Sequence, residues 1–172
     1  MSQQTAGITV TPGTWTIDLG ASSLRFEVKH MWGLGTVKGQ FDRFGGTLTV
    51  DDNPVDAQLH IDASSVNTHN KQRDKDLRSA KFFDVDHYRE IGFELASVSE
   101  NESGLEIGGY LLIRESRLWV DLPVDADENR DRLVLRATTP ISREAAGLDW
   151  NWMGMIRGDA TVHLEFILTR NR

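Results

Sequence analysis

The sequence predicts an all-β protein, an antiparallel sandwich or barrel of roughly eight strands with one short helix. Three observations support this prediction. Apolar and polar residues alternate along most of the chain, turn residues separate the alternating runs, and one polar segment interrupts them. Alternation with a period of two is typical of strands that bury one face, and short turns between such runs favour antiparallel pairing.

The alternating runs follow one another from near Trp15 to the C-terminus. The clearest runs lie at 24–28, 55–61 and 160–168, with Ile167 as an apolar residue on the polar side. Less regular runs lie at 37–50, 90–98, 105–113, 118–124 and 131–138. Turn residues separate them at 51–54, 100–104, 115–117 and 125–130. Glycines within the runs indicate the bulges or bends that a closing sheet needs, at Gly39, Gly45, Gly46, Gly108 and Gly109.

Residues 70–80 form the polar segment, and their charges are spaced three and four apart. This spacing predicts a short exposed helix, with Thr68 or Asn67 as its N-cap. Phe82 and Phe83 follow the helix directly. We expect such a helix to lie across one end of the sheet with both rings turned inward. Two roles stay open for it, a lid over a cavity or a plug that completes the core.

Length and composition limit the class of protein. The chain has 172 residues, of which 39% are hydrophobic and 26% charged, as expected of one folded domain. Lys and Arg number 19 against 26 Asp and Glu, for a net charge of −7, so nucleic acid is not an expected partner. The sequence has no cysteine, which excludes a disulfide framework, a thiol nucleophile and a cysteine-ligated zinc.

The N-terminal region shows no targeting signal. Residues 1–13 lack both a basic start and the apolar stretch of a signal peptide. No segment approaches the ~20 consecutive apolar residues of a membrane helix. We therefore expect a cytoplasmic protein without stable membrane insertion, in which a flexible arm, 1–13, precedes a single domain, 14–170.

Sequence motifs for catalysis or metal binding are missing. The five histidines show no zinc-site spacing, and no G-x-S-x-G nucleophile motif occurs. One acidic stretch begins like a calcium loop, but it places Arg130 where glycine is needed and Arg136 where a bidentate glutamate is needed. His60 and His163 fall on the polar faces of their strands, and His30, before a glycine-rich turn, fits a structural hydrogen bond better than catalysis. We therefore expect no metal, no cofactor and no enzymatic activity.

The segment 150–156 concentrates large apolar side chains, including Trp150, Trp152, Met153 and Met155. A strand that is apolar on both faces is either doubly buried or lines a cavity. Methionine and aromatic side chains suit a cavity that adapts to a chain-like ligand. A closed sheet of about eight strands has room for side chains or for one small ligand. None of the clearest inward-facing positions carries a charge, so an apolar ligand is the expected occupant of any void.

Several short motifs occur in a fixed order along the chain. They are Trp15–Asp18, Leu24–His30, Val37–Phe41, Ile61–Thr68, Leu77–Ser79, Phe82–Val85, Ile91–Phe93 and Gly147–Asn151. The ordered set resembles the YceI-like family over roughly residues 14–170. The chain departs from the family at Ala21 and Asp76, where histidine is usual, and this removes two donors for a ligand head group.

The resemblance implies an antiparallel lipocalin-like β-barrel with an elongated apolar pocket. It implies binding, carriage or storage of a polyisoprenoid, an isoprenoid quinone or a fatty-acid-like amphiphile, and because members often form dimers, it also implies a homodimer. The resemblance assigns pocket positions to Phe26, Val28, Phe41, Phe82, Phe83, Phe93, Trp150 and Trp152. The apolar segment and the end of the first clear strand add Met153, Met155 and His30 as ligand-binding candidates.

Two other functions remain open at the level of sequence. One is a small barrel enzyme that folds an apolar substrate for cyclisation or isomerisation, with His30 or Tyr110 assisting. Such catalysis can depend on orientation of the substrate alone. The other is a stress-response or interaction protein in which any cavity is incidental.

Overall fold

The computed structural model describes residues 10–30, 34–51, 55–102, 104–148 and 157–172. In these ranges one antiparallel sheet of eleven strands accompanies a single α-helix, α1 (Lys71–Arg78). The strands are β1 (Gly13–Ile17), β2 (Ser23–His30), β3 (Gly35–Phe41), β4 (Phe44–Val50), β5 (Asp56–Asp62), β6 (Val66–Asn67), β7 (Glu90–Asn101), β8 (Gly104–Ile113), β9 (Ser116–Asn129), β10 (Arg132–Ile141) and β11 (Arg157–Arg170).

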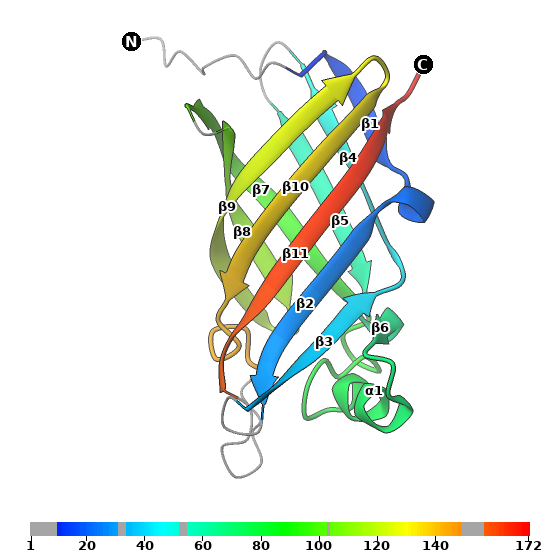
Figure 1. Ribbon diagram of the computed structural model, residues 1–172, viewed down its shortest axis with the longest axis vertical. Helices are drawn as coiled ribbons and strands as arrows, with labels where there is room; N and C mark the ends of the chain where they lie inside the picture. Colours follow the sequence, from blue (N-terminus) through cyan, green and yellow to red (C-terminus); the bar gives the residue numbers. More distant parts are fainter. Residues whose placement is uncertain (1–9, 31–33, 52–54, 103, 149–156) are drawn as a thin grey trace.

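The sheet closes into a barrel (Figure 1). Eight strands form the ring in the order β1-β4-β5-β7-β8-β9-β10-β11, and β11 pairs back onto β1. β2, β3 and β6 continue the sheet from β11. β1 and β2 lie end to end along β11, separated by a short 3-10 helix, η1 (Leu19–Ala21). The expected antiparallel barrel of about eight strands with one short helix is thus confirmed.

The outward apolar residue Ile167 is explained by η1. The backbone carbonyl of Ile167 accepts hydrogen bonds from the Asp18 N–H (2.8 Å) and the Ser22 hydroxyl (3.4 Å). The Ile167 N–H donates to the same hydroxyl (2.9 Å). The η1 turn therefore lies beside β11, in the gap between β1 and β2. Ile167 is only 5% exposed, although it lies on the outer side of β11, and this burial explains why an apolar residue occupies the position.

The predicted turn at 125–130 is wrong, because β9 runs on through these residues to Asn129. Val124 and Leu133 are buried on the inner face, and Asp125 and Asp127 between them are exposed on the outer face in continued alternation. β9 pairs with β10 up to Asn129 and Arg132, so the chain reverses only at Arg130 and Asp131. Acidic residues on the exposed face of a strand thus resemble turn residues in the sequence.

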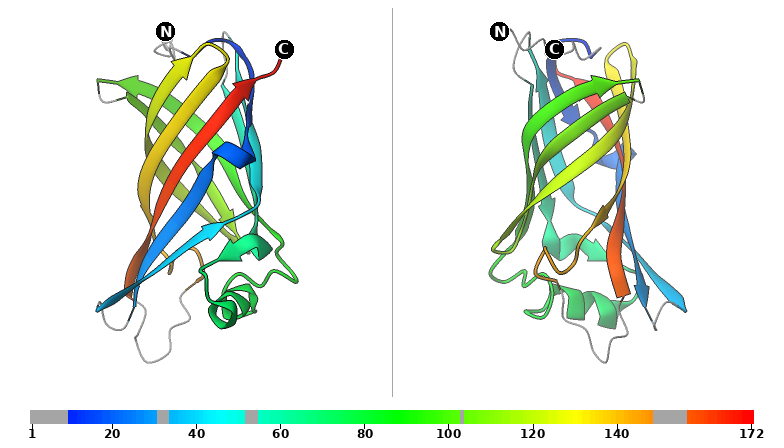
Figure 2. Two further views of the ribbon diagram at one scale, coloured as in Figure 1. Left: turned by 45° about the vertical axis from the view of Figure 1, so that its right-hand side comes forward. Right: turned by 90° about the vertical axis from the view of Figure 1, so that its left-hand side faces the viewer.

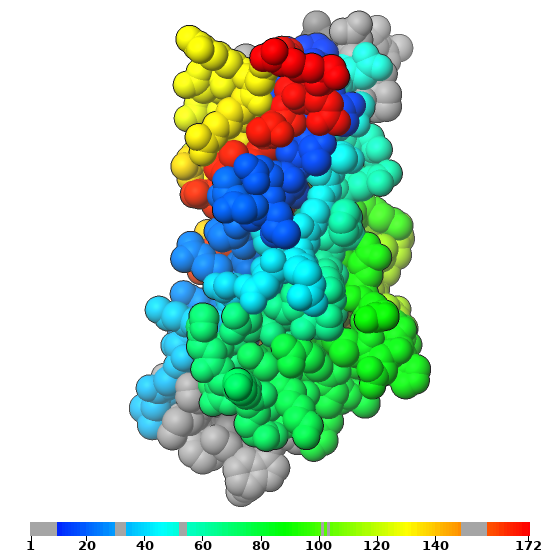
Figure 3. Space-filling view, turned by 90° about the vertical axis from the view of Figure 1, so that its right-hand side faces the viewer, coloured from blue at the N-terminus to red at the C-terminus, as the bar shows by residue number. Residues whose placement is uncertain are grey.

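The predicted helix is confirmed, but its predicted N-cap is wrong. Asn70 caps α1, and its side-chain oxygen accepts from the Arg73 N–H at 3.0 Å. Thr68 instead donates its hydroxyl to the Asp74 carboxylate at 2.5 Å. The helix and the segment after it lie at the lower end of the barrel in Figure 1, and Figure 3 shows the green segment covering that end of one face.

The hairpin of β7 and β8 separates from β5 over its outer half. β5 pairs with β7 only from Gln58 and Glu94 to the other end of the strand. A bulge between Leu95 and Ser97 lies opposite Gly108 and Gly109, as the glycines predict. Beyond this bulge β7 no longer pairs with β5, whereas β8 stays paired with β9 as far as Leu105 and Val124, and the tip of the hairpin projects at the upper end of the barrel (Figures 1 and 2). No helix in the described residues is long and apolar enough to cross a membrane.

Candidate functional site

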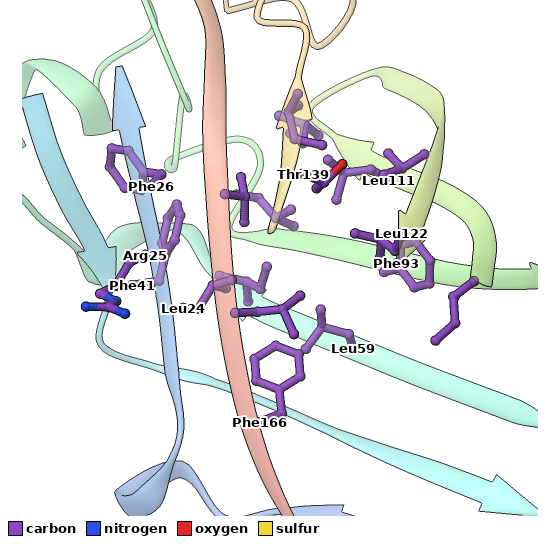
Figure 4. A pocket seen from close by; sticks show the side chains of 18 of the residues that line it. Leu24, Arg25, Phe26, Phe41, Leu59, Phe93, Leu111, Leu122, Thr139 and Phe166 are labelled. Atoms are coloured by element: carbon purple, nitrogen blue, oxygen red, sulfur yellow. The ribbon is translucent and has the colours of Figure 1, made fainter. Parts of the chain in front are cut away.

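A long apolar cavity of about 450 Å³ occupies the interior of the barrel. Its walls are formed by every second residue along the strands, the residues that face inward. Examples are Leu24, Phe26 and Val28 on β2 and Ala57, Leu59 and Ile61 on β5. This volume lies within the roughly 300–1,000 Å³ that is usual for small-molecule sites. In Figure 4, Phe26 and Phe41 lie across the cavity from Phe93, Leu111 and Leu122.

Phenylalanine rings form part of the wall, and glycines on neighbouring strands make room for them. The centre of the Phe41 ring lies 5.6 Å from the centres of both the Phe26 and the Phe83 rings. Phe41 and Phe83 meet edge to face. A Cβ atom at Gly39 would stand 2.4 Å from Cζ of Phe26, and one at Gly109 would stand 2.4 Å from Cζ of Phe93. Only glycine leaves both rings in their present positions.

Six of the residues assigned to the pocket from the sequence line this cavity: Phe26, Val28, Phe41, Phe82, Phe83 and Phe93. His30 is the last residue of β2, and its side chain lies outside the described part of the structure. Four further candidates also lie outside the described residues: Trp150, Trp152, Met153 and Met155.

Several lining residues were not assigned to the site from the sequence. They include Leu24, Leu59, Ile107, Leu111, Leu122, Leu135, Leu164 and Phe166. The alternation of β2, β5 and β11 already placed some of them on an inner face. No sequence signal, however, distinguishes an inward side chain that borders a void from one that packs against another side chain.

One end of the cavity, here called the α1 end, is covered by α1 and residues 79–89. Leu77, Phe82 and Phe83 face the cavity from this segment, and Phe82 is 9% exposed. Arg73 and Asp76 add two charges to the same rim. The two phenylalanines form part of the cavity wall and leave the space inside the barrel open, which agrees with a lid rather than a plug.

Three arginines attach this cover to the barrel through backbone carbonyls. Arg78 donates to the carbonyls of Ser64 (2.9 Å) and Val66 (3.2 Å). Arg73 donates to the Thr68 carbonyl at 2.9 Å and to its hydroxyl at 2.8 Å. Arg114, at the β8–β9 turn, donates to the Phe82 carbonyl at 3.0 Å. Charge-assisted bonds of this kind are among the stronger hydrogen bonds in proteins.

The opposite end, here called the Trp15 end, is filled by side chains. Trp15 and Leu133 are fully buried there, and Val10 is 8% exposed. The Arg170 guanidinium lies 5.9 Å from the centre of the Trp15 ring and bonds to Asp131 at 2.8 and 3.1 Å. Hydrogen bonds from the Arg172 and Arg170 side chains lower the pKa of the Asp131 carboxyl.

The chemistry available to the cavity is limited by its few polar side chains. In the described lining these are Thr47, Gln58, Thr139, Arg25, Arg73, Asp76 and Arg143. No group of three His, Asp or Glu that could hold a metal ion occurs in the described residues. Tyr110, considered above as a catalytic assistant, lies on the outer face, 5.1 Å from the Trp119 ring and beneath the Arg117 guanidinium. The described lining of the cavity is therefore suited to enclosing an apolar molecule.

Comparison with known proteins agrees with this geometry. The model of the YceI-like domain matches residues 15–168. The chain belongs to the YceI-like family. Among its relatives is the UPF0312 protein SA2479 of Staphylococcus aureus (strain N315), which is 34% identical over 148 residues, or 80% of this chain and 83% of that protein.

Solved structures of the YceI-like family share the barrel. Burkholderia cenocepacia BcnA superposes with a TM-score of 0.79 at 19% identity, over 88% of this chain and 98% of that one. A polyisoprenoid binding domain from Saccharophagus degradans superposes with a TM-score of 0.76 at 17% identity, over 91% and 98%. Of the two family positions that here lack histidine, Asp76 lines the α1 end, whereas Ala21 lies exposed on η1.

Proposed function

We propose that this protein binds an apolar chain-like ligand inside the barrel and carries or stores it. The class includes polyisoprenoids, isoprenoid quinones and fatty-acid-like amphiphiles. The observation that supports the proposal most directly is the cavity of about 450 Å³ with almost wholly apolar walls. Protein interiors are normally packed with few voids larger than a water molecule, so a cavity of this size indicates a ligand.

The energetics of the cavity favour a hydrocarbon chain over a polar molecule. Each methylene that leaves water contributes about 0.8 kcal/mol, so a chain of ~16 methylenes contributes ~13 kcal/mol before the cost of ordering it. A polar molecule would lose its hydrogen bonds to water and find few partners along these walls. The solved relative described as a polyisoprenoid binding domain supports the same class of ligand.

The test is binding by the delipidated protein. We expect palmitate and geranylgeraniol to displace an environment-sensitive fluorescent lipid, and native mass spectrometry to show one ligand bound. In the variant Leu135→Trp, which fills the cavity from β10, affinity falls at least tenfold. Leu19→Trp is the matched control, because Leu19 is 40% exposed on η1, outside the barrel.

Two results would contradict the proposal. One is the absence of displacement by any chain-like amphiphile together with the absence of co-purifying lipid. The other is equal loss of affinity in both tryptophan variants, which would place the ligand outside the cavity. Recovery of a chemically altered ligand after incubation would indicate turnover instead of carriage.

A further inference from the structure

We propose that the cavity takes one anionic amphiphile with a single chain of about 16–20 carbons, its head group at the α1 end and its chain terminus at the Trp15 end. This inference rests on the function proposed above and specifies the length, charge and direction of the ligand. Three features of the barrel support it: its volume, the filling of one end, and the difference in charge between the two ends.

The volume limits the length of the chain. A cavity of about 150 Å³ in a protein core accommodates one benzene molecule. The present cavity, about 450 Å³, therefore accommodates about three times that content, or ~18 carbon atoms. A much longer chain would leave part of its hydrocarbon in water or would force the walls apart, and both cost free energy.

The Trp15 end provides the stop for the chain. Trp15 and Leu133 are fully buried across it, and the ion pair of Arg170 with Asp131 lies beyond Trp15. Ala57 pairs with Leu48, which in turn pairs with Trp15, so a side chain at position 57 reaches the cavity next to this stop. A larger residue there shortens the space for the chain.

The charges at the α1 end favour an anionic head group. Among the described lining residues at this end, two are cationic, Arg73 and Arg143, and one is anionic, Asp76. Hydrogen bonds hold both guanidinium groups in place: Arg73 donates to Thr68, and Arg143 donates to the carbonyls of Gly158 (3.0 Å) and Leu148 (3.3 Å). The segment after β10 that carries Arg143 lies at the same end of the barrel as α1 (Figure 1). Two fixed cations at a partly apolar rim attract a carboxylate or phosphate more strongly than exposed ones do.

The charges beyond the Trp15 end oppose an anionic head group. A polar hollow outside this end is lined, among described residues, by five carboxylates and two arginines: Glu100, Asp125, Asp127, Glu128, Asp131, Arg130 and Arg170. Val10 and Leu105 border both this hollow and the cavity, so the two spaces lie next to each other at this end. An anionic head would meet net negative charge here, and the bound ligand therefore points the other way.

The first experiment measures affinity against chain length. The delipidated protein is titrated with saturated fatty acids of ten, sixteen and twenty carbons and with a forty-carbon polyprenyl phosphate. We expect the highest affinity at about 16–20 carbons and at least tenfold weaker binding of the longest chain. Hexadecanol should bind more weakly than palmitate, and hexadecylamine should bind more weakly than hexadecanol.

Two matched variants locate the stop. Ala57→Phe adds a ring beside the Trp15 end, whereas Ala160→Phe adds one near the α1 end, where Ala160 pairs with Ile141 at the end of β10. We expect Ala57→Phe to move the optimum to a chain shorter by about four to six carbons and to leave the ten-carbon acid unaffected. Ala160→Phe should weaken every chain length by a similar factor.

The second experiment reads the direction of the chain. A variant that keeps Trp15 and carries phenylalanine in place of Trp32, Trp119, Trp150 and Trp152 reports on the Trp15 end alone. Palmitate brominated near its terminal methyl should quench this fluorescence strongly, and palmitate brominated next to the carboxylate should not. Circular dichroism verifies that the variant is folded, and the length series does not depend on it.

The outcomes separate this inference from the proposed function. If no amphiphile of any length binds, the carrier function itself is wrong. If the forty-carbon chain binds best, if Ala57→Phe weakens all lengths equally, or if bromine near the head quenches Trp15, the carrier function stands and the assigned length and direction are wrong. Equal affinity for the acid, the alcohol and the amine would overturn the assigned charge.

Discussion

At the scale of single residues, the cover of the cavity depends on a carboxylate buried at the start of α1. Asp74 is 7% exposed and accepts hydrogen bonds from the Thr68 N–H (2.8 Å) and the Thr68 hydroxyl (2.5 Å). The Arg73 Nε–H donates to the same hydroxyl at 2.8 Å. One carboxylate thus connects the helix to the chain that leaves the barrel after β6.

Replacement of this carboxylate should destabilise the protein. In Asp74→Ala two donors of Thr68 lose their acceptor, and we expect the free energy of unfolding to fall by about 2–3 kcal/mol. Urea denaturation measures this change. Lys75→Ala on the exposed side of α1 is the control and should change the free energy of unfolding by less than about 0.5 kcal/mol. Equal effects of the two substitutions would show that the buried contact contributes nothing of its own.

Gly39 controls the shape of the cavity wall. In Gly39→Ala the new methyl group would stand 2.4 Å from Cζ of Phe26 and 2.8 Å from Cγ2 of Thr68, so the ring must move. We expect a loss of about 1–3 kcal/mol in the free energy of unfolding, together with weaker ligand binding. Gly92→Ala, whose added methyl finds no atom closer than 3.6 Å, should leave affinity unchanged. Retention of wild-type affinity in the Gly39 variant would show that the Phe26 ring is not fixed by its neighbour.

At the scale of elements, the sequence predicts strands better than it predicts where they end. β2, β5 and β11 alternate with a period of two because one face of each lies against the interior. β9 continues through Asp125 and Asp127 because pairing with β10 satisfies its backbone whatever its outer side chains are. The same limit applies to the N-cap of α1, since Thr68 and Asn70 are both good caps and only tertiary contacts select the second.

The attachment of α1 can be weakened by a substitution at the last residue of the helix, Arg78, which bonds to the barrel. Arg78→Met removes the donors to the Ser64 and Val66 carbonyls but keeps an unbranched apolar side chain. We expect faster hydrogen–deuterium exchange in residues 68–89 and faster ligand dissociation, because the cover opens more often. Lys75→Met provides the control on the exposed side of the helix. Faster exchange in the segment without faster dissociation would mean that the ligand leaves by another route.

At the scale of the whole molecule, the antiparallel sheet follows from the alternation in the sequence, but neither its closure into a barrel nor its empty interior does. Alternating strands with hairpin turns dictate a sheet, and the small number of strands allows that sheet to close. Whether the interior is filled depends on the summed volumes of inward side chains from eight strands, such as Leu59, Leu111 and Leu164. No local pattern contains that sum: the apolar segment 150–156 leaves a packed strand and a cavity wall both open, and the family resemblance implies the cavity.

Carboxylates that join distant parts of the barrel should make its stability depend on pH. The Ser64 hydroxyl and the Arg43 guanidinium lower the pKa of Asp62, and Arg172 and Arg170 lower that of Asp131 below its usual value of 3.8. A carboxyl with a lowered pKa in the folded state contributes stability above its unfolded pKa and loses that contribution as the pH falls through the folded value. The contribution of these two carboxyls should therefore be constant from pH 7 to about pH 5, and the thermal midpoint should fall below about pH 4.

The double variant Asp62→Asn/Asp131→Asn tests the assignment. It should have a lower midpoint than the wild type at pH 6, because the pairs of Asp62 with Arg43 and of Asp131 with Arg170 are weakened. Its midpoint should decrease less steeply below pH 4, because two of the groups that bind protons on acid unfolding are gone. Asp56→Asn, at an exposed position of β5, serves as the control. If the double variant and the wild type decrease in parallel, other carboxylates determine the acid limit, and the contacts of Asp62 and Asp131 do not set it.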